Sequence, residues 1–355
     1  MSQKVKRKLV KGNDAIAMGA IKAGCSNYFG YPITPQNEIP EYMSAHLPRA
    51  GGQYVQAESE VAAINMLLGA AATGVRSMTS SSSPGISLMQ EGLSYMAGSE
   101  LPGVIVNMVR SGPGLGGIAA SQADYFQATK GGGHGDYRLI VLAPSTVQEL
   151  YDMTILAFDL ADKYRNPVMV LGDSILGQMR EPLVEREDPV IPPDKDDWAL
   201  TGAKGRAARH IKSMYLEGDL LVAHNYKLHQ KYQGIASQEI RSEAMDVEDA
   251  DLVVVAYGSA ARISKTAVQM AQKEGHQVGL YRPISLFPYP NEELRGLSRR
   301  VKRFLTVELS MGQMVEDVQL SVEGDASVHF FGKPHLMTPD EILEQIERIV
   351  EVPIP

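Results

Sequence analysis

The chain has 355 residues, of which 44% are hydrophobic and 21% are charged, and its formal net charge is −8 at pH 7. Because one hydrophobic core rarely serves more than about 300 residues, two domains are expected. The acidic balance offers no attraction to nucleic acid or to an anionic membrane, and no apolar run reaches the length of about 18 residues that membrane insertion needs. The single cysteine, Cys25, excludes an internal disulfide and is typical of a reducing compartment, which predicts a cytoplasmic location.

Short apolar runs alternate with helical periods over residues 12–185, which predicts a parallel α/β sheet flanked by helices. The expected strands of this part are 27–30, 53–57, 76–79, 104–109, 139–142 and 167–171. The expected helices are 14–22 with Asn13 as its cap, 34–46 with Thr34 as N-cap and Pro35 in the first turn, 60–72, 87–97 and 147–164.

A second part follows a change in composition. Residues 181–197 are rich in Glu, Asp and Pro, which indicates a linker, and a polar helical connection is expected over about 219–243. A new series then begins, with strands expected at 252–256, 277–280 and 304–307 and a helix at 260–273. We therefore expect a first domain over 1–185, a linker with a helical connection over 186–247, and a smaller α/β domain over 248–355.

Three expected strand ends carry side chains that suit ligand chemistry. The first strand opens into the segment 31–35, the second ends in Glu58-Ser59-Glu60 at a helix entrance, and the 104–109 strand ends in Arg110. Because parallel strands end at the same edge of a sheet, a hydroxyl, a carboxylate and a guanidinium could converge there on one small molecule. Structural roles are open as well: Thr34 as a helix cap, Glu60 as a first-turn carboxylate, and Arg110 in a distant ion pair.

Glycine-rich and serine-rich loops add further candidates. Residues 112–117 match the Gly-x-Gly-x-x-Gly string, but Pro113 lacks a backbone donor and the next strand ends without an acidic residue for a ribose, so a dinucleotide site is a weak interpretation. His134, within the glycine-rich segment 131–135, could contact a substrate or a partner, or be a plain loop histidine. The run 80–85 could bind an anion or cap a helix.

Several groups that a complete enzyme would need are missing from the sequence. It has no Walker-type phosphate loop, no Gly-Asp-Gly motif for a magnesium diphosphate, and too few cysteines for an iron–sulfur cluster. If the chain is catalytic, another chain must complete the site. A stand-alone nucleotide-binding module and a scaffold subunit without catalytic residues remain alternatives.

Taken together, several strings resemble the α subunit of the 2-oxoacid:ferredoxin oxidoreductases. They are Gly30-Tyr31-Pro32-Ile33-Thr34-Pro35, Glu58-Ser59-Glu60-Val61-Ala62-Ala63, the serine-rich turn before Gly85, and Arg110. Gly258-Ser259 and the segment from Arg282 to Pro288 resemble that family's second domain, so the resemblance covers nearly the whole chain. It implies that residues 1–185 form the pyrimidine-side thiamine diphosphate domain and 248–355 a transketolase C-terminal-like domain.

The resemblance also implies roles for individual residues. Glu60 would be the carboxylate that hydrogen-bonds the aminopyrimidine ring, and Tyr31, Pro32 and Ile33 would contact the same cofactor. Thr34 and Arg110 would be catalytic groups that meet the oxo and carboxylate groups of the substrate, with His134 as a further substrate contact. No metal ligand is expected in this chain.

The partners follow from the same resemblance. A β subunit would hold the diphosphate and Mg²⁺, and γ and ferredoxin-like δ subunits would complete the complex. Iron–sulfur clusters on partner subunits would pass electrons to ferredoxin, and coenzyme A would take the acyl group. The string 133–138 looks most similar to the 2-oxoisovalerate type. The alternative, 2-oxoglutarate, would need a second cation in the pocket, which Lys130, His134 or Arg138 could supply.

Overall fold

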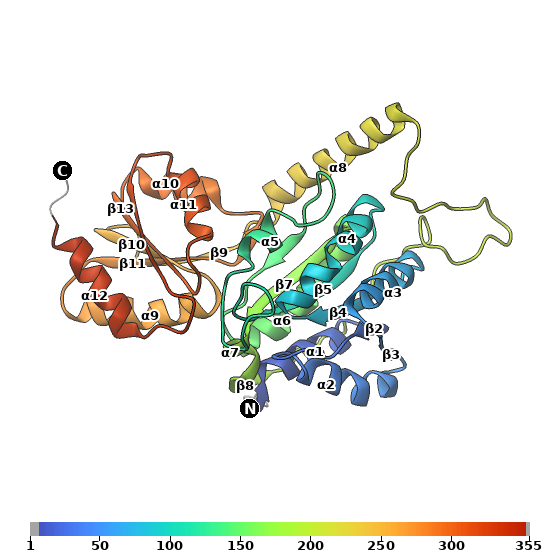
Figure 1. Cartoon of the computed structure of the whole chain (residues 1–355), viewed down its shortest axis with the longest axis horizontal. Helices are drawn as coiled ribbons and strands as arrows, with labels where there is room; N and C mark the ends of the chain where they lie inside the picture. Colours follow the sequence, from blue (N-terminus) through green and yellow to red (C-terminus); the bar gives the residue numbers. More distant parts are fainter. Residues whose placement is uncertain (1–6, 353–355) are drawn as a thin grey trace.

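The computed structural model describes residues 7–352, whose backbone forms a seven-stranded sheet, a five-stranded sheet and a two-stranded ribbon. In Figure 1 the seven-stranded sheet fills the middle of the molecule and the five-stranded sheet lies beside it, toward the C-terminus. The ribbon pairs β1 (Arg7–Lys11) with β8 (Arg180–Val184) in antiparallel fashion. No helix in this described part is both long enough and apolar enough to cross a membrane.

The larger sheet is almost entirely parallel, as the alternating pattern predicts. Its order is β12 (Ser285–Phe287), β6 (Ile140–Leu142), β7 (Pro167–Asp173), β5 (Gly103–Val109), β4 (Ser77–Ser81), β2 (Asn27–Gly30) and β3 (Gln53–Gln56). Only β12 runs antiparallel to its neighbour. Both central strands β5 and β7 are buried along their full length, which is typical of parallel sheets covered on both faces.

Four long helices pack in pairs around this sheet. α1 (Gly12–Lys22) lies against α6 (Val147–Tyr164), and α3 (Glu60–Ala72) lies against α4 (Ser83–Gly98). α1 approaches α6 closely because Gly19 has no Cβ; such an atom would lie 2.6 Å from the Tyr151 carbonyl oxygen. Three short helices complete this part: α2 (Glu38–His46), α5 (Tyr125–Thr129) and α7 (Ser174–Gln178), with a 3-10 turn at Pro48–Ala50.

Two expected helix caps are wrong. α1 begins at Gly12, and the Asn13 side-chain amide instead donates to the Pro35 carbonyl at 2.9 Å and to Glu38 at 2.8 Å. α2 begins only at Glu38, so Thr34 is not its N-cap. The tertiary contact from Asn13 holds residues 34–37 in a turn, which overrides the local capping signal.

A long connection joins the two large sheets. Residues 185–217 contain no helix or strand, and α8 (Gly218–Gln238) then projects past the edge of the molecule (Figure 1). Only Leu228, Tyr232 and Ile235 of α8 are buried, in agreement with the expected solvated helix. The helical connection ends earlier than expected, because Ser242–Met245 forms strand β9 of the five-stranded sheet.

The smaller sheet repeats the three-layer plan. Its order is β14 (Ser327–Gly332), β13 (Arg303–Glu308), β10 (Leu252–Val255), β11 (Val278–Pro283) and β9, with β9 antiparallel. α9 (Gly258–Lys273) packs with α12 (Pro339–Val350) on one face, and α10 (Asn291–Ser298) packs with α11 (Met314–Val322) on the other (Figure 1).

Buried hydrogen bonds tie the two sheets together. The Gln122 side chain donates to the Tyr257 carbonyl at 2.8 Å and accepts from the Leu309 amide at 2.9 Å. Lys130 forms an ion pair with Asp317 at 2.6 Å. These contacts join segments more than a hundred residues apart, so they fix the position of the smaller sheet against the larger one.

Arg282 is the most completely bonded cation at this junction. It is 5% exposed and donates to both carboxylate oxygens of Glu149, at 2.8 and 2.7 Å, while Glu243 lies 3.0 Å from its Nε. Burial alone would raise the pKa of Glu149, but the hydrogen bonds and charge of Arg282 lower it overall from its ordinary value of 4.5. The pair therefore stabilises the folded chain when Glu149 is ionised.

We expect Arg282→Ala to lower the free energy of unfolding by about 3 kcal/mol at neutral pH, because it leaves a partly buried carboxylate without its partner. Thermal or urea unfolding of the full chain measures this loss. Because the folded-state pKa of Glu149 is lowered, the stabilisation is present above the ordinary pKa and is lost as the pH falls below it. The difference between wild type and variant should therefore shrink below about pH 4.5.

The matched control is Arg300→Ala, since Arg300 pairs with Glu248 on the surface, where the two side chains are 56% and 70% exposed. Its loss should stay below about 1 kcal/mol. Equal losses in the two variants at neutral pH would contradict the assignment of Arg282 as a stabilising junction residue.

Candidate functional site

The strand ends that carry the candidate residues lie side by side. β3, β2, β4 and β5 are consecutive neighbours in the sheet and all run parallel. Thr34 follows β2, Glu60 follows β3 and Arg110 follows β5, so all three leave the same edge. The prediction that these three strand ends lie at one edge of the sheet is therefore confirmed.

Glu60 is the first residue of α3, which Ser59 caps by accepting a hydrogen bond from the Ala62 amide at 3.2 Å. The Glu60 residue is only 6% exposed, yet its carboxylate forms no hydrogen bond with any residue in 7–352. Its Oε1 lies against Gly85 in the first turn of α4: a Cβ on residue 85 would lie 2.6 Å from that oxygen. The arrangement therefore holds a nearly buried carboxylate that the chain itself does not pair.

Arg110 connects two loops at this edge. Its guanidinium donates to the Thr34 carbonyl at 3.0 Å and to the Leu115 carbonyl at 2.8 Å. The residue is 8% exposed, its Nε is buried without a partner, and within 7–352 it forms no ion pair. A distant carboxylate, one of the alternatives open from the sequence, is therefore not found in the described chain, and the positive charge is left for another group.

The Tyr31–Thr34 segment lies open beside this cation. Thr34 contacts Arg110 through its carbonyl, and its side chain is exposed. Tyr31 is 38% exposed, Pro32 is also exposed and Ile33 is half-buried. Large apolar side chains on neighbouring segments are exposed too, namely Val61, Leu115 and Ile118. Exposed apolar groups gathered around buried polar ones are typical of a contact surface.

The serine-rich turn, residues 80–85, connects β4 to α4 at the same edge of the sheet. Ser80, buried in β4, hydrogen-bonds the Tyr28 hydroxyl at 2.6 Å and the side-chain oxygen of Gln36. By contrast, the Ser81 hydroxyl and the Gln36 Nε2 are buried without partners. Ser82 occupies the N-cap position of α4, but its side chain makes no capping bond. The sequence indicates this turn as a candidate anion-binding or capping segment, but it does not show which of the hydroxyls lack a hydrogen-bond partner.

This donor set suits a planar heterocycle. Buried polar groups are almost always paired in a folded protein, so several unpaired ones at a single strand edge indicate a ligand or a second chain. Here the Ser81 hydroxyl and the Arg110 Nε are buried without partners, and the nearly buried Glu60 carboxylate forms no hydrogen bond within residues 7–352. A ring bearing nitrogen acceptors and an amino group could pair with them.

His134 is not brought into this group. It is exposed, and its carbonyl accepts a hydrogen bond from Ser94 near the far end of α4. Because Ser94 is eleven positions beyond Ser83, the two are separated by roughly 16 Å along the helix axis. Two other cations considered for a second carboxylate also have contacts of their own: Lys130 pairs with Asp317, and Arg138 lies 5.9 Å from the centre of the Phe287 ring.

The glycine loop 112–117 does not form a dinucleotide site. Such a site needs the loop to lead directly into a helix N-terminus, but the next helix, α5, begins only at Tyr125. Gly116 has a φ of +63°, and a Cβ on it would lie 1.8 Å from the Ser111 carbonyl oxygen. The glycines therefore serve a tight turn that brings the Leu115 carbonyl to Arg110.

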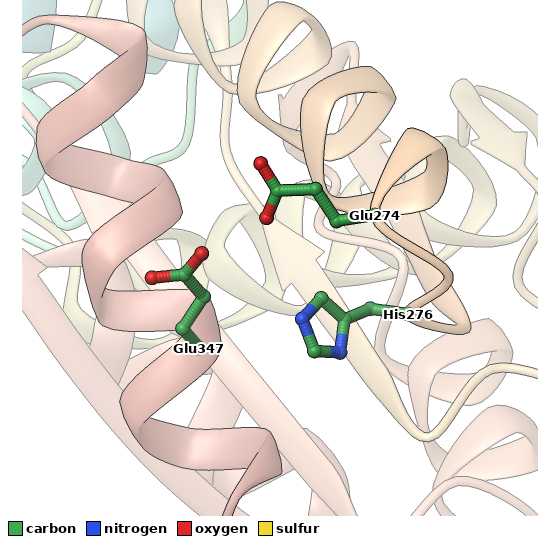
Figure 2. Close-up of side chains that lie close together, drawn as sticks. All are labelled: Glu274, His276 and Glu347. Carbon is green, nitrogen blue, oxygen red and sulfur yellow. The ribbon is translucent and has the colours of Figure 1, made fainter.

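Two other features of the molecule lie away from this edge. A cleft of about 730 Å³ lies between α8 and the segment before β6, lined among others by Arg138, Tyr226 and Phe287. It borders the start of a strand, which is the opposite edge of a parallel sheet. Figure 2 shows the side chains of Glu274, His276 and Glu347 close together, between the end of α9 and α12 on the smaller sheet.

Comparison with known proteins supports the interpretation of this edge. The family described as "Pyruvate flavodoxin/ferredoxin oxidoreductase, thiamine diP-bdg" matches residues 18–249, and "Pyruvate:ferredoxin oxidoreductase core domain II" matches residues 250–340. Ketoisovalerate oxidoreductase subunit VorB of Methanothermobacter thermautotrophicus is 50% identical over 343 residues, covering 96% of this chain and 97% of the relative. The 2-oxoglutarate synthase subunit KorA of the same organism is 40% identical over 366 residues, covering 95% and 97%.

Solved structures show the same fold. The 2-oxoglutarate:ferredoxin oxidoreductase from Magnetococcus marinus, with 2-oxoglutarate, coenzyme A and succinyl-CoA bound, matches with a TM-score of 0.85 and 27% identity. The match covers 97% of this chain and 65% of that chain, so this chain spans about two thirds of its length. A split-gene transketolase, at 11% identity and a TM-score of 0.58, shares the fold alone.

These findings confirm the resemblance and the fold class drawn from the sequence. A thiamine-diphosphate-binding family matches well over half of the chain, and relatives that match nearly end to end are themselves named as subunits. The chain therefore belongs to the 2-oxoacid:ferredoxin oxidoreductase family, as a subunit of a multi-subunit enzyme with a thiamine diphosphate-binding domain.

Proposed function

We propose that this chain supplies the aminopyrimidine side of the thiamine diphosphate site in an enzyme that decarboxylates 2-oxoisovalerate oxidatively and passes the acyl group to coenzyme A. The observation that carries the proposal is the Glu60 carboxylate, nearly buried at the strand edge and without a partner in residues 7–352. When bound, thiamine diphosphate would supply the nucleophilic carbon that adds to a 2-oxo group.

Glu60 would hold the proton at the ring nitrogen of the aminopyrimidine. A carboxylate in that position must be close to the ring and shielded from water, since proton transfer needs hydrogen-bond contact. The entrance of α3 supports this role, because only 6% of Glu60 is exposed and Gly85 has no side chain to cover its carboxylate. Tyr31, Pro32 and Ile33, on the adjoining segment, would form the wall against which the ring packs.

Arg110 and Thr34 would meet the substrate. The two terminal guanidinium nitrogens, Nη1 and Nη2, each donate once to a carbonyl, which leaves their remaining N–H groups for a carboxylate. The Thr34 side chain, exposed next to this cation, would contact the oxo group. His134 contacts the far end of α4 through Ser94, and its role as a substrate contact stays a prediction.

The other parts of the enzyme would come from partner chains. The sequence lacks a magnesium-diphosphate motif, so a β subunit would hold the diphosphate with Mg²⁺. Cys25, its only cysteine, is buried, so the iron–sulfur clusters that lead to ferredoxin would lie on partner subunits. Further γ and δ subunits would complete the complex. The exposed apolar side chains around Glu60 and Arg110 suit a subunit contact. The cytoplasmic location and the division at residues 185 and 248 stay predictions from the sequence.

The preference for 2-oxoisovalerate over 2-oxoglutarate has two supports. The VorB relative is 50% identical, whereas the KorA relative of the same organism is 40% identical. In addition, Lys130 is paired with Asp317, and Arg138 lies against Phe287 in the cleft beside α8, away from the edge that carries Glu60. A branched aliphatic side chain would need no such cation.

We expect Glu60→Gln to reduce kcat of the assembled enzyme by roughly 10²–10⁴-fold, because the amide cannot exchange the ring proton. Steady-state turnover with saturating thiamine diphosphate measures the effect. Glu58→Gln is the matched control, since Glu58 is exposed two positions earlier and should leave turnover within about twofold of wild type. An unaltered rate for Glu60→Gln would remove this residue from the chemistry.

We also expect kcat/KM of the assembled enzyme for 2-oxoisovalerate to exceed that for 2-oxoglutarate by roughly 10²-fold, since a second carboxylate would be desolvated without a partner. Both substrates should be assayed with the same electron acceptor. A clear preference for the diacid would overturn the substrate assignment and leave the role of Glu60 untouched.

A further inference from the structure

We propose that the Ser81 hydroxyl is a positioning group for the Glu60 carboxylate, and that Gly85 keeps open the space in which the two meet. The inference rests on the proposed function of Glu60 and extends it to two residues that would touch the carboxylate rather than the substrate.

Three chain segments converge at this point. Ser81 is the last residue of β4, Glu60 the first of α3, and Gly85 lies in the first turn of α4. A Cβ on residue 85 would lie 2.0 Å from the Ser81 Oγ and 2.6 Å from the Glu60 Oε1. The two oxygens therefore flank the same small space from different elements.

Both oxygens are left without partners by the chain. Ser81 is fully buried and its hydroxyl makes no hydrogen bond within the described residues, and the same holds for the carboxylate of Glu60. The preceding residue shows the contrast, because Ser80 is bonded on both sides, to Tyr28 and to Gln36. The Thr79 and Ser82 hydroxyls are also buried and unpaired, so it is the position of the Ser81 hydroxyl beside Glu60 that indicates a contact formed when the cofactor is bound.

The chemistry of the pair explains what the hydroxyl would do. A carboxylate that holds a ring nitrogen with one oxygen must have its other oxygen fixed, or it rotates away from the ring. A serine hydroxyl donates to an ionised carboxylate and can turn to accept from a protonated one. Ser81 could therefore support Glu60 on both sides of a proton transfer.

Gly85 has a separate and testable part in this arrangement. Any larger residue would place a carbon inside contact distance of both oxygens, and the Ser81 hydroxyl, which can rotate, would be displaced first. Gly85→Ala should therefore separate the pair while keeping both functional groups in the chain.

The test uses the assembled enzyme with Ser81→Ala, and Thr79→Val as the matched control. Thr79 is also on β4, fully buried and unpaired at its hydroxyl, but it does not end the strand. We expect Ser81→Ala to lower kcat by about 10–10²-fold, the size expected for one hydrogen bond to a charged group, and to weaken binding of thiamine diphosphate, while KM for the 2-oxoacid stays within about twofold. Gly85→Ala should show the same pattern, and Thr79→Val should match wild type.

The melting temperature of the full chain gives a readout independent of activity. Because the hydroxyl has no partner in the chain, its removal should leave the melting temperature unchanged or slightly higher. Wild-type kcat and cofactor affinity in Ser81→Ala would overturn the proposal, as would a drop in melting temperature that accounts for the lost activity. If Glu60→Gln is inactive while Ser81→Ala is normal, only this inference fails; if Glu60→Gln is fully active, the proposed function fails with it.

Discussion

The proposed chemistry depends on one nearly buried carboxylate, Glu60, that has no partner within residues 7–352. Moving a charged group out of water costs several kcal/mol unless a proton, a cation or hydrogen-bond donors compensate it. Within residues 7–352 Glu60 has neither an ion-pair partner nor a hydrogen-bond donor at its carboxylate, although Ser59 and Gly85 hold it in place. A ligand or a second chain would supply the missing partner, which agrees with a subunit of a larger enzyme.

Two buried arginines illustrate the difference between a stabilising cation and an available one. Arg282 forms ion pairs with Glu149 and Glu243, so its charge is compensated at the junction of the two sheets. Arg110 is nearly as buried but donates only to backbone carbonyls, so its charge is left uncompensated beside Thr34. A buried cation that no carboxylate compensates does little for stability, yet it suits the binding of a substrate acid.

The sequence predicts the features that depend on local pattern. The helix 147–164 and the strand 27–30 have the expected bounds, and the helix over 60–72 matches as well, because their periodicity and caps lie within the segment itself. The shared position of Thr34, Glu60 and Arg110 at one edge of the sheet could be predicted, because parallel strands end at the same edge. What could not be predicted depends on distant contacts: Asn13 reaches Pro35 and shifts the start of α2, and strand β9 is polar and gains its place only by pairing with β11. The proximity of Ser81 and Gly85 to Glu60 also needs three segments to meet, which no local pattern records.

In the proposed enzyme the Glu60 carboxylate meets the aminopyrimidine ring once a partner chain is in place. A structure of the assembled enzyme with thiamine diphosphate would measure this contact. We expect a Glu60 oxygen within about 2.6–3.2 Å of a ring nitrogen, with the diphosphate held by the partner. A Glu60 side chain paired with a cation of the partner, and a ring bound elsewhere, would contradict it.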